Sequence, residues 1–302
     1  MKIFTILTFF IFTQFQICCS SSDIIIRTGE KYYSQILERE IEYSVLLPHD
    51  YFLDEIIHYP VIYLLHGIHG NDKSWLEGNR VDHLIDSLVK LGNLGNFIYV
   101  MPSAYDSYYI NNFDSSFRYM DFFTMELVPA IDSIYRTEKD RESSTLLGIS
   151  MGGFGSIVLG LQHTELFGTI VSLSAAVRTE EIFKQVPQAK YDDYFEKVYG
   201  PELAGEDRIT DHWKANSPYY VTDSTILASA RHQNWYIDCG MDDFLLEANE
   251  AFHRWMILNN IDHDYHVRPG SHNWSYWHRS LIYALMYINE KIWQSSHYRG
   301  EN

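Results

Sequence analysis

The most constraining feature of this 302-residue sequence is a G-x-S-x-G turn at residues 148–152, with Ser150 at its centre. The residues before it, 144–147, form an apolar run typical of a strand, and residues 153–160 are typical of a packed helix. A strand, a sharp turn and a helix in this order hold the serine at a strained apex. Glycines flank it because a side chain there would collide with the neighbouring backbone. The alternative is a glycine-rich turn whose serine only caps the helix.

A serine hydroxyl is a poor nucleophile unless a base and an orienting acid accompany it. In an open α/β sheet, ligand-handling residues lie in the loops beyond the carboxyl ends of the strands. The loop after strand 235–239 offers carboxylates, and the loop at 268–274 offers an imidazole. The chain order is then serine, acid, histidine, as in one large class of hydrolases.

Among the acids we prefer Asp243, because it ends its loop just before a helix and can reach the next loop. Asp238 and Asp242 remain alternatives, and an aspartate at this place is also a favoured helix N-cap. His272 is the expected base because it follows a Pro-Gly-Ser turn that lifts it out of the sheet. The carboxylate would fix the imidazole tautomer and leave Nε2 to take the serine proton. The alternative is a histidine in a surface loop.

A tetrahedral intermediate also needs two backbone N–H donors aimed at its oxyanion. We expect these donors to be the amides of Met151, which starts the helix after the serine, and Ile68, in a glycine turn at 66–70. A zinc site on His66 and His69 is disfavoured because spacing positions no third ligand. The sequence therefore predicts no metal and no cofactor.

Apolar runs and helical spacings alternate along the chain, which predicts an α/β fold with a mostly parallel sheet covered on both faces. The expected strands are 34–47 (one or two antiparallel strands at an edge), 61–65, 96–101, 168–174, 235–239 and 264–267. The expected helices are 81–91, 120–135 (kinked at Pro129), 245–258 and 276–293. An aromatic-rich stretch, about 179–230, interrupts this rhythm and is interpreted as an insertion over the carboxyl ends of the strands. We expect one domain spanning 23–302.

Residues 1–22 have a charged start, an apolar stretch and a small-residue end, the pattern of a secretory signal peptide. This predicts an exported protein, periplasmic or secreted. Cys18 or Cys19 is an alternative as the lipid-modified residue of a bacterial lipoprotein, which would be the protein's contact with a membrane. The remaining cysteine is Cys239, so the mature chain is expected to fold without an internal disulfide, or with one if a leading cysteine survives.

The formal net charge of −17 and the lack of a basic cluster argue against nucleic acid as a partner, because a polyanion would be repelled. A neutral small-molecule or carbohydrate substrate fits better. Aromatic residues lie in or beside the loops expected to rim the cleft and are candidates for holding sugar or aryl groups, although each could equally pack in the core. They are Trp75, Tyr105, Tyr108, Trp274 and Trp277.

Four ordered segments resemble the esterase D / feruloyl esterase family of α/β-hydrolases, which includes carbohydrate esterase family 1, S-formylglutathione hydrolases and mycolyltransferases. These segments are 63–70, 148–155, 237–245 and 270–274, with Trp277 beyond them. The resemblance implies an α/β-hydrolase fold over about residues 34–293. Carried over to this sequence, the family pattern puts the nucleophile on Ser150, the acid on Asp243 and the base on His272, with oxyanion donors near Ile68 and Met151.

The expected function is therefore that of an exported serine esterase that removes acetyl or feruloyl groups from carbohydrate. An S-formylglutathione hydrolase-like thioesterase and an acyltransferase use the same three residues and remain alternatives. A non-catalytic glycan-binding module on the same fold is the alternative from another class.

Overall fold

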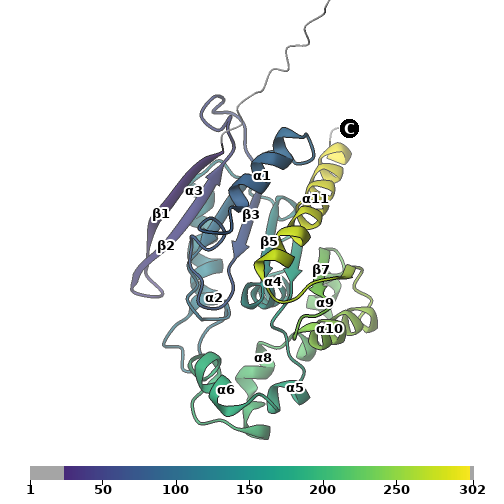
Figure 1. Ribbon diagram of the computed structural model, residues 1–302. Helices are drawn as coiled ribbons and strands as arrows, with labels where there is room; N and C mark the ends of the chain where they lie inside the picture. The colour runs from purple at the N-terminus through teal and green to yellow at the C-terminus, as the bar shows by residue number, and fades with distance from the viewer. Residues whose placement is uncertain (1–23, 300–302) are drawn as a thin grey trace, which may run out of the picture.

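The computed structural model describes residues 24–299, arranged around an eight-stranded sheet (Figure 1). The strand order is β1-β2-β4-β3-β5-β6-β7-β8. The strands are β1 (Ile25–Ser34), β2 (Arg39–Leu47), β3 (Val61–Leu65), β4 (Ile98–Pro102), β5 (Ser144–Ile149), β6 (Thr169–Leu173), β7 (Asn234–Gly240) and β8 (Asp264–Arg268). The segment predicted as a signal peptide, with Cys18 and Cys19, lies outside the described residues. Within 24–299, no helix combines the length and apolarity that crossing a membrane requires.

The strand directions confirm the predicted mostly parallel sheet. Strand β1 is antiparallel to β2 and β2 is antiparallel to β4, whereas all neighbours from β4 through β3 to β8 are parallel. The carboxyl ends of these parallel strands therefore share one edge, where the loops expected to carry the site meet.

The predicted edge strand at 34–47 was too short at its N-terminal side. The structure adds β1, whose pairing with β2 shifts register between Arg27 and Glu30, where Gly29 has a φ of 69°. This bulge interrupts the alternation of apolar and polar side chains by which a strand is recognised. Residues 25–33 consequently carried no strand signal.

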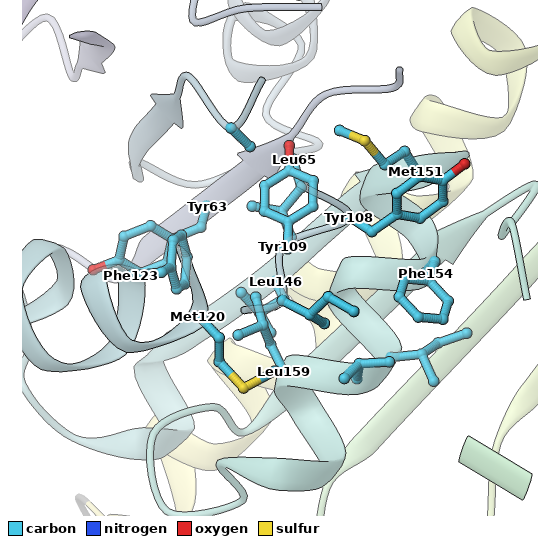
Figure 2. Packing of buried hydrophobic residues seen from close by; sticks show 14 of the residues in the cluster. Tyr63, Leu65, Tyr108, Tyr109, Met120, Phe123, Leu146, Met151, Phe154 and Leu159 are labelled. Atoms are coloured by element: carbon cyan, nitrogen blue, oxygen red, sulfur yellow. The ribbon is translucent and has the colours of Figure 1, made fainter. Parts of the chain in front are cut away.

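Helices cover both faces of the sheet (Figure 1). Helices α1 (Val81–Lys90) and α11 (Trp274–Arg299) pack on one face through Ile85, Leu281 and their buried neighbours. Helices α4 (Met151–Gln162) and α10 (Leu246–Leu258) pack on the other face through Ile157, Phe252 and residues around them. Figure 2 shows part of this second core, where aromatic and aliphatic side chains from several elements interdigitate.

The segment predicted as one helix kinked at Pro129 forms three consecutive helical pieces. They are α2 (Tyr119–Asp121), a π-helical piece η1 (Phe122–Leu127) and α3 (Val128–Ile134). Proline has no N–H to donate to the preceding turn, so the regular ladder cannot run through position 129. The wider π-helical turns lie immediately before it.

Residues 179–230, predicted as an insertion, form a series of short helices. They are α5 (Glu180–Lys184), α6 (Gln188–Tyr194), α7 (Glu196–Tyr199), the 3₁₀ helix η3 (Gly205–Arg208), α8 (Asp211–Ala215), the 3₁₀ helix η4 (Pro218–Tyr220) and α9 (Ser224–Ala230). Aromatic packing joins them, with Phe183 stacked on Trp213 at 5.4 Å between ring centroids. The fully buried Arg208 donates hydrogen bonds to the side chain of Gln188 at 2.9 Å and to the carbonyl of Leu203 at 3.1 Å. Helices α5 and α6 lie beyond the carboxyl ends of the strands (Figure 1).

Candidate active site

Ser150 occupies the turn between β5 and α4 with a φ of 76° and a ψ of −105°. This backbone conformation is strained for a residue with a side chain, so its surroundings must hold it. The amide of Ser150 donates to the carbonyl of Leu173 at 3.0 Å, and its carbonyl accepts from the amide of Ala176 at 2.8 Å. Both partners lie at or just beyond the end of β6. The sheet itself therefore fixes the turn.

The two glycines of the G-x-S-x-G turn are required by close backbone contacts. A Cβ atom on Gly148 would lie 2.0 Å from the carbonyl oxygen of Gly152. A Cβ atom on Gly152 would lie 2.0 Å from the carbonyl oxygen of Leu65. Neither backbone oxygen can move aside without shifting a strand or helix, so a larger residue at either position would displace the serine.

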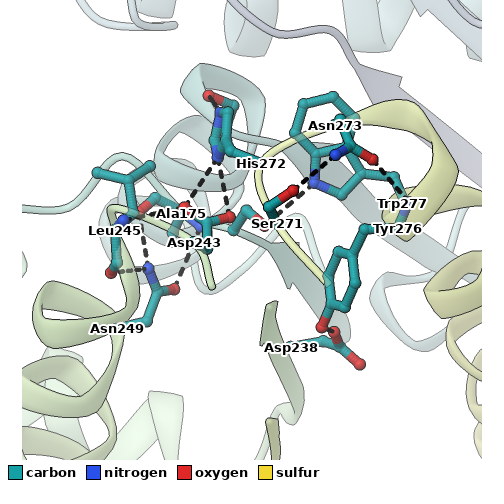
Figure 3. A network of polar contacts seen from close by, with 12 residues as sticks. Ala175, Asp238, Asp243, Leu245, Asn249, Ser271, His272, Asn273, Tyr276 and Trp277 are labelled. Atoms are coloured by element: carbon teal, nitrogen blue, oxygen red, sulfur yellow. Dashed lines mark hydrogen bonds and ion pairs between the residues drawn. The ribbon is translucent and has the colours of Figure 1, made fainter. Parts of the chain in front are cut away.

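Three side chains from separate loops meet at this turn, and Figure 3 shows two of them, His272 and Asp243, in contact. The Oγ atom of Ser150 lies 2.9 Å from Nε2 of His272. On the other side of the ring, Nδ1 lies 2.9 Å from Oδ2 and 3.1 Å from Oδ1 of Asp243. An ionised carboxylate only accepts hydrogen bonds, so Nδ1 carries the imidazole proton and Nε2 presents its lone pair to the serine. This geometry suits proton transfer from the hydroxyl.

The environment of Asp243 keeps its carboxyl ionised. Burial alone would raise the pKa of this group, but hydrogen bonds from His272 and from the amide of Leu245 outweigh it and lower the pKa below the usual value. The Leu245 amide donates to Oδ1 at 2.9 Å. Donors to the charged form stabilise it. The N-cap of the following helix is Leu245, without a side-chain cap, so Asp243 is not the helix N-cap considered as its alternative; its bond to the amide two residues ahead belongs to a turn.

The two alternative acids have other surroundings. Asp238 is fully buried, accepts a hydrogen bond from Ser280 at 2.9 Å and from the hydroxyl of Tyr276, and forms an ion pair with Arg268. In Figure 3 it lies beside Tyr276, away from His272. Asp242 is exposed, and its amide donates to the carbonyl of Gly270 at 2.8 Å. Of the three candidates, Asp243 is the one that contacts His272.

Aromatic rings enclose the imidazole of His272. Trp277 meets it edge to face at 4.9 Å between centroids, and the indole Nε1 of Trp277 donates to the hydroxyl of Ser174 at 3.0 Å. The ring of Phe244 lies 4.7 Å away on another side. The buried Trp277, anchored to Ser174, restricts rotation of the imidazole. The histidine therefore stays aligned between serine and carboxylate.

The expected oxyanion donors lie next to Ser150. A Cβ atom on Gly67 would be 3.6 Å from the Cβ of Ser150, so the loop carrying Ile68 passes directly beside the serine. Within residues 24–299, the amides of Ile68 and Met151 donate no backbone hydrogen bond, and both residues line the cavity described next. These N–H groups are available to a bound oxygen.

His66 supports this loop in a neutral form. Burial lowers its pKa to about 4, although a hydrogen bond to the carbonyl of Gly67 opposes this shift. Its Nε2 accepts from the amide of Ala104 at 2.9 Å, so Nδ1 is the donor to the carbonyl of Gly67 at 2.7 Å. Both ring nitrogens are therefore engaged by the backbone. Within residues 24–299, no group of three or more His, Cys, Asp or Glu side chains could hold a metal ion.

A cavity of about 500 Å³ contains this arrangement. Ser150, His272, Ile68 and Met151 line one part of it. The rest comes from the loop after β6, from the residues after Asp243 and from helices α5 and α6, and includes Ala176, Arg178, Ile182, Val186, Lys190, Tyr194, Phe195, Phe244 and Glu247. Its size lies within the range of pockets that bind small organic ligands.

Of the five aromatic residues predicted to hold substrate, Tyr108 lines the cavity and the others do not. Trp75 has no exposed surface and packs edge to face on Trp274 at 5.5 Å, and Trp274 packs in the same way on Trp277. The three tryptophans thus form a cluster behind the site. Tyr105 is exposed but packs against Phe117, outside the cavity. The large apolar rings of the tryptophans thus pack against one another and do not contact the cavity.

Sequence reasoning missed three residues of the site. Phe244 follows the acid and is 73% exposed beside His272. Arg178 lines the cavity. The buried Asn249 joins helix α10 to the loop after β6, because its side-chain amide donates to the carbonyl of Ala175 at 2.9 Å and accepts from the amide of Ala175 at 3.2 Å. For Asn249, the one signal in the sequence was a polar residue on the otherwise apolar face of the predicted helix 245–258.

A mostly parallel sheet with helices on both faces, and a strained serine after its central strand, define an α/β-hydrolase. The chain belongs to the esterase family described as "Putative esterase", whose model matches residues 34–288. It is a carboxylic ester hydrolase.

Individual relatives agree with this assignment. The chain is 26% identical over 279 residues to an acetyl esterase of Caldicellulosiruptor saccharolyticus, covering 86% of this chain and 96% of the relative. It is 32% identical over 142 residues to an endo-1,4-beta-xylanase/feruloyl esterase of Xylanibacter ruminicola, covering 44% of this chain and 19% of that protein. A solved ferulic acid esterase superposes with a TM-score of 0.76 at 27% identity, covering 90% of this chain and 99% of that one.

Proposed function

We propose that this esterase acts through an acyl-enzyme intermediate on Ser150, with His272 as general base and Asp243 as the residue that orients it. The observation that carries the proposal is the continuous series of contacts from Oγ of Ser150 through His272 to Asp243, with distances of 2.9 Å at both steps. A serine, an imidazole and a carboxylate in this order are the components that acyl transfer requires.

In the first half of the reaction, Nε2 of His272 takes the proton of Ser150 as Oγ bonds to the ester carbonyl carbon. The carbonyl oxygen becomes negative and accepts hydrogen bonds from the amides of Ile68 and Met151. The same Nε2 then returns the proton to the alcohol oxygen as the C–O bond breaks. The alcohol leaves, and the acyl group stays on Ser150.

In the second half, water replaces the alcohol. Nε2 takes a proton from water as the water oxygen bonds to the acyl carbon. When the bond to Oγ breaks, Nε2 returns that proton to the serine. The products are a carboxylic acid and the free enzyme, and Asp243 stabilises the imidazolium formed in both halves.

For the substrate, we favour acetyl or feruloyl esters of carbohydrate. The names of the relatives support an acetyl or a feruloyl group, and the relative that carries a xylanase supports a polysaccharide source. A cavity of about 500 Å³ is much larger than an acetyl group needs, so it can also hold an aryl or sugar portion.

Hydrolysis of a defined panel by the purified protein tests the proposal. The panel holds 4-nitrophenyl acetate, methyl ferulate, acetylated xylan and S-formylglutathione. We expect turnover of the first three, and a Ser150→Ala variant with an unchanged circular dichroism spectrum should lose about 10⁴-fold or more of it. Glycan binding by a folded wild-type protein that turns over none of these esters would favour a binding module instead.

Export is the second part of the proposal and is supported by the pattern of residues 1–22 alone. Expression of the full chain in a bacterium should deliver esterase activity to the periplasm or medium, whereas a chain starting at residue 23 should remain in the cytoplasm. A fractionation in which both forms stay cytoplasmic would contradict export. Metabolic labelling with a fatty acid would show whether Cys18 or Cys19 carries a lipid.

A further inference from the structure

Arg178 is a charged residue of the cavity for which ester hydrolysis at Ser150 provides no role. It lies just beyond the carboxyl end of β6 and lines the same cavity as Ser150 and His272. One of its terminal nitrogens, Nη1, donates to the carbonyl of Ala176 at 2.8 Å. The guanidinium carbon lies 4.8 Å from the centre of the Phe195 ring. These contacts hold the group in place and leave other N–H donors unused.

The surroundings of Arg178 supply no counter-charge. Within residues 24–299, no carboxylate forms an ion pair with it, and Nε and Nη2 donate no hydrogen bond. Burial lowers the pKa of the guanidinium, and the groups that oppose this shift are the hydroxyls of Tyr108 and Tyr199. The cation therefore lies among aromatic side chains, of which Tyr108 and Phe195 also line the cavity. A charge taken from water is costly unless an opposite charge compensates it.

The guanidinium has the geometry to bind an anionic group. Its planar set of donors matches a carboxylate through two parallel hydrogen bonds, which are stronger than hydrogen bonds between neutral groups. The other cation of the cavity, Lys190, is exposed and well solvated. The formal charge of −17 is spread over the chain, and salt screens exposed charges beyond about 8 Å under physiological conditions. The carboxylate of the cavity, Glu247, is likewise exposed, and within residues 24–299 it forms no ion pair with Arg178. Arg178 is therefore the charged group of the cavity that is least exposed to water.

We propose that Arg178 forms an anion subsite and that the esters this enzyme prefers carry a carboxylate, in addition to the ester group, on either the acyl or the alcohol portion. This inference rests on the proposed hydrolysis at Ser150 and specifies its substrate class. Half-esters of dicarboxylic acids present the charge on the acyl side. Esters of sugar acids or of hydroxybenzoic acids present it on the alcohol side.

Two pairs of esters, matched except for one charge, distinguish these sources. For the acyl side, mono-4-nitrophenyl adipate is compared with 4-nitrophenyl hexanoate. For the alcohol side, 4-acetoxybenzoate is compared with its methyl ester. We expect the wild-type kcat/KM to favour the charged member of at least one pair by about tenfold to a hundredfold, the range for a hydrogen-bonded charge pair.

Substitutions assign the preference to Arg178. Arg178→Met should abolish it, and Arg178→Lys should keep part of it, because the charge remains without the planar donors. The matched control is Arg254→Met, which removes an exposed arginine from α10, outside the cavity. This control should leave the preference unchanged. If Arg178→Met fails to fold, Arg178→Gln takes its place, because glutamine keeps a donor toward Ala176. This variant should also abolish the preference for the charged ester.

Some outcomes would overturn the inference while leaving the proposed function in place. A wild-type enzyme that hydrolyses the neutral esters but shows no preference in either pair has no anion subsite. A preference that persists in Arg178→Met or Arg178→Gln belongs to another residue, and Arg178 then only anchors Phe195. Failure of the proposed function differs from both, because the wild type would then turn over neither the neutral nor the charged esters.

Discussion

The Oδ2 atom of Asp243 lies 2.9 Å from Nδ1 of His272, and this contact determines which nitrogen of the imidazole faces Ser150. An asparagine at position 243 could offer an amide N–H to Nδ1, which would move the ring proton to Nε2 and block proton transfer from the serine. We expect Asp243→Asn to lower kcat by about 10³- to 10⁴-fold with little change in the fold. Hydrolysis of 4-nitrophenyl acetate under saturating conditions measures the effect.

The neighbouring carboxylate provides a matched control for this substitution. Asp242 is exposed and makes its hydrogen bond through the backbone, so Asp242→Asn should retain kcat within about twofold. If the two variants lost activity equally, the carboxylate of Asp243 would have no special role. The orienting group would then have to be sought elsewhere.

The low pKa of His66 predicts a pH-dependent stability. The folded protein holds this histidine neutral down to about pH 4, whereas an unfolded histidine takes up a proton below its ordinary value of 6.5. Between these values the unfolded state binds the additional proton, so stability falls as the pH falls through this window and is unaffected by His66 above it. The expected contribution is about 2 kcal/mol lost between pH 8 and pH 5.

Urea unfolding of the wild type and of His66→Asn at pH 8 and pH 5 isolates this contribution. The variant should be less stable at both values, because asparagine cannot reproduce both backbone hydrogen bonds, but its stability should change less with pH. Equal m-values in all four experiments would show that the unfolded states are comparable. Equal losses of stability on acidification in both proteins would mean that His66 titrates normally in the fold.

Site residues that a local sequence pattern specifies could be predicted, whereas those that depend on tertiary contacts were harder to identify. Ser150 and its glycines are specified within five residues, because a strand, a turn and a helix require that pattern. The choice between Asp238 and Asp243 was harder, since both lie near the end of one strand. Contacts with residues distant in the sequence, Arg268 on β8 and Tyr276 and Ser280 on α11, show that Asp238 is already engaged.

The fold was predictable to a similar degree. Buried parallel strands are recognised in a sequence as apolar runs, so the observed strands β3, β5 and β6 lie at or near the predicted positions. By contrast, β1 was missed because a bulge near Gly29 breaks its pattern. The substrate contacts were the least predictable. Trp75 lies in a plausible rim loop, yet it packs into the core, whereas Arg178 had no local signal and is placed in the cavity by the sheet.

The tight turn at Ser150 predicts a sharp difference between two adjacent glycines. A Cβ on Gly152 would lie 2.0 Å from the carbonyl oxygen of Leu65, whereas the nearest atom to a Cβ on Gly153 is 3.0 Å away. We expect Gly152→Ala to cost more than about 3 kcal/mol of stability or to prevent folding. Gly153→Ala should cost less, because alanine also favours the helix by about 1 kcal/mol. Soluble yield and melting temperature measure the difference between the two variants. Equal values for both would contradict the prediction.

The ring of Phe244 predicts a contribution to substrate binding that is separable from stability. It lines the cavity beside His272 and is 73% exposed, so its removal exposes little core. We expect Phe244→Ala to reduce kcat/KM for methyl ferulate about three- to tenfold, as for the loss of one aromatic contact. Most of this change should appear in KM. The melting temperature should stay close to that of the wild type.

The matched control is Phe52→Ala, which removes an equally large, 58% exposed ring from a loop outside the cavity. It should leave both KM and kcat unchanged, since no described contact joins it to the site. A comparison with 4-nitrophenyl acetate adds a second test, because a small acyl group offers less surface for the ring to contact. If Phe244→Ala lowered kcat equally for both esters while KM stayed constant, the ring would act by holding His272 in place and would not be a binding surface.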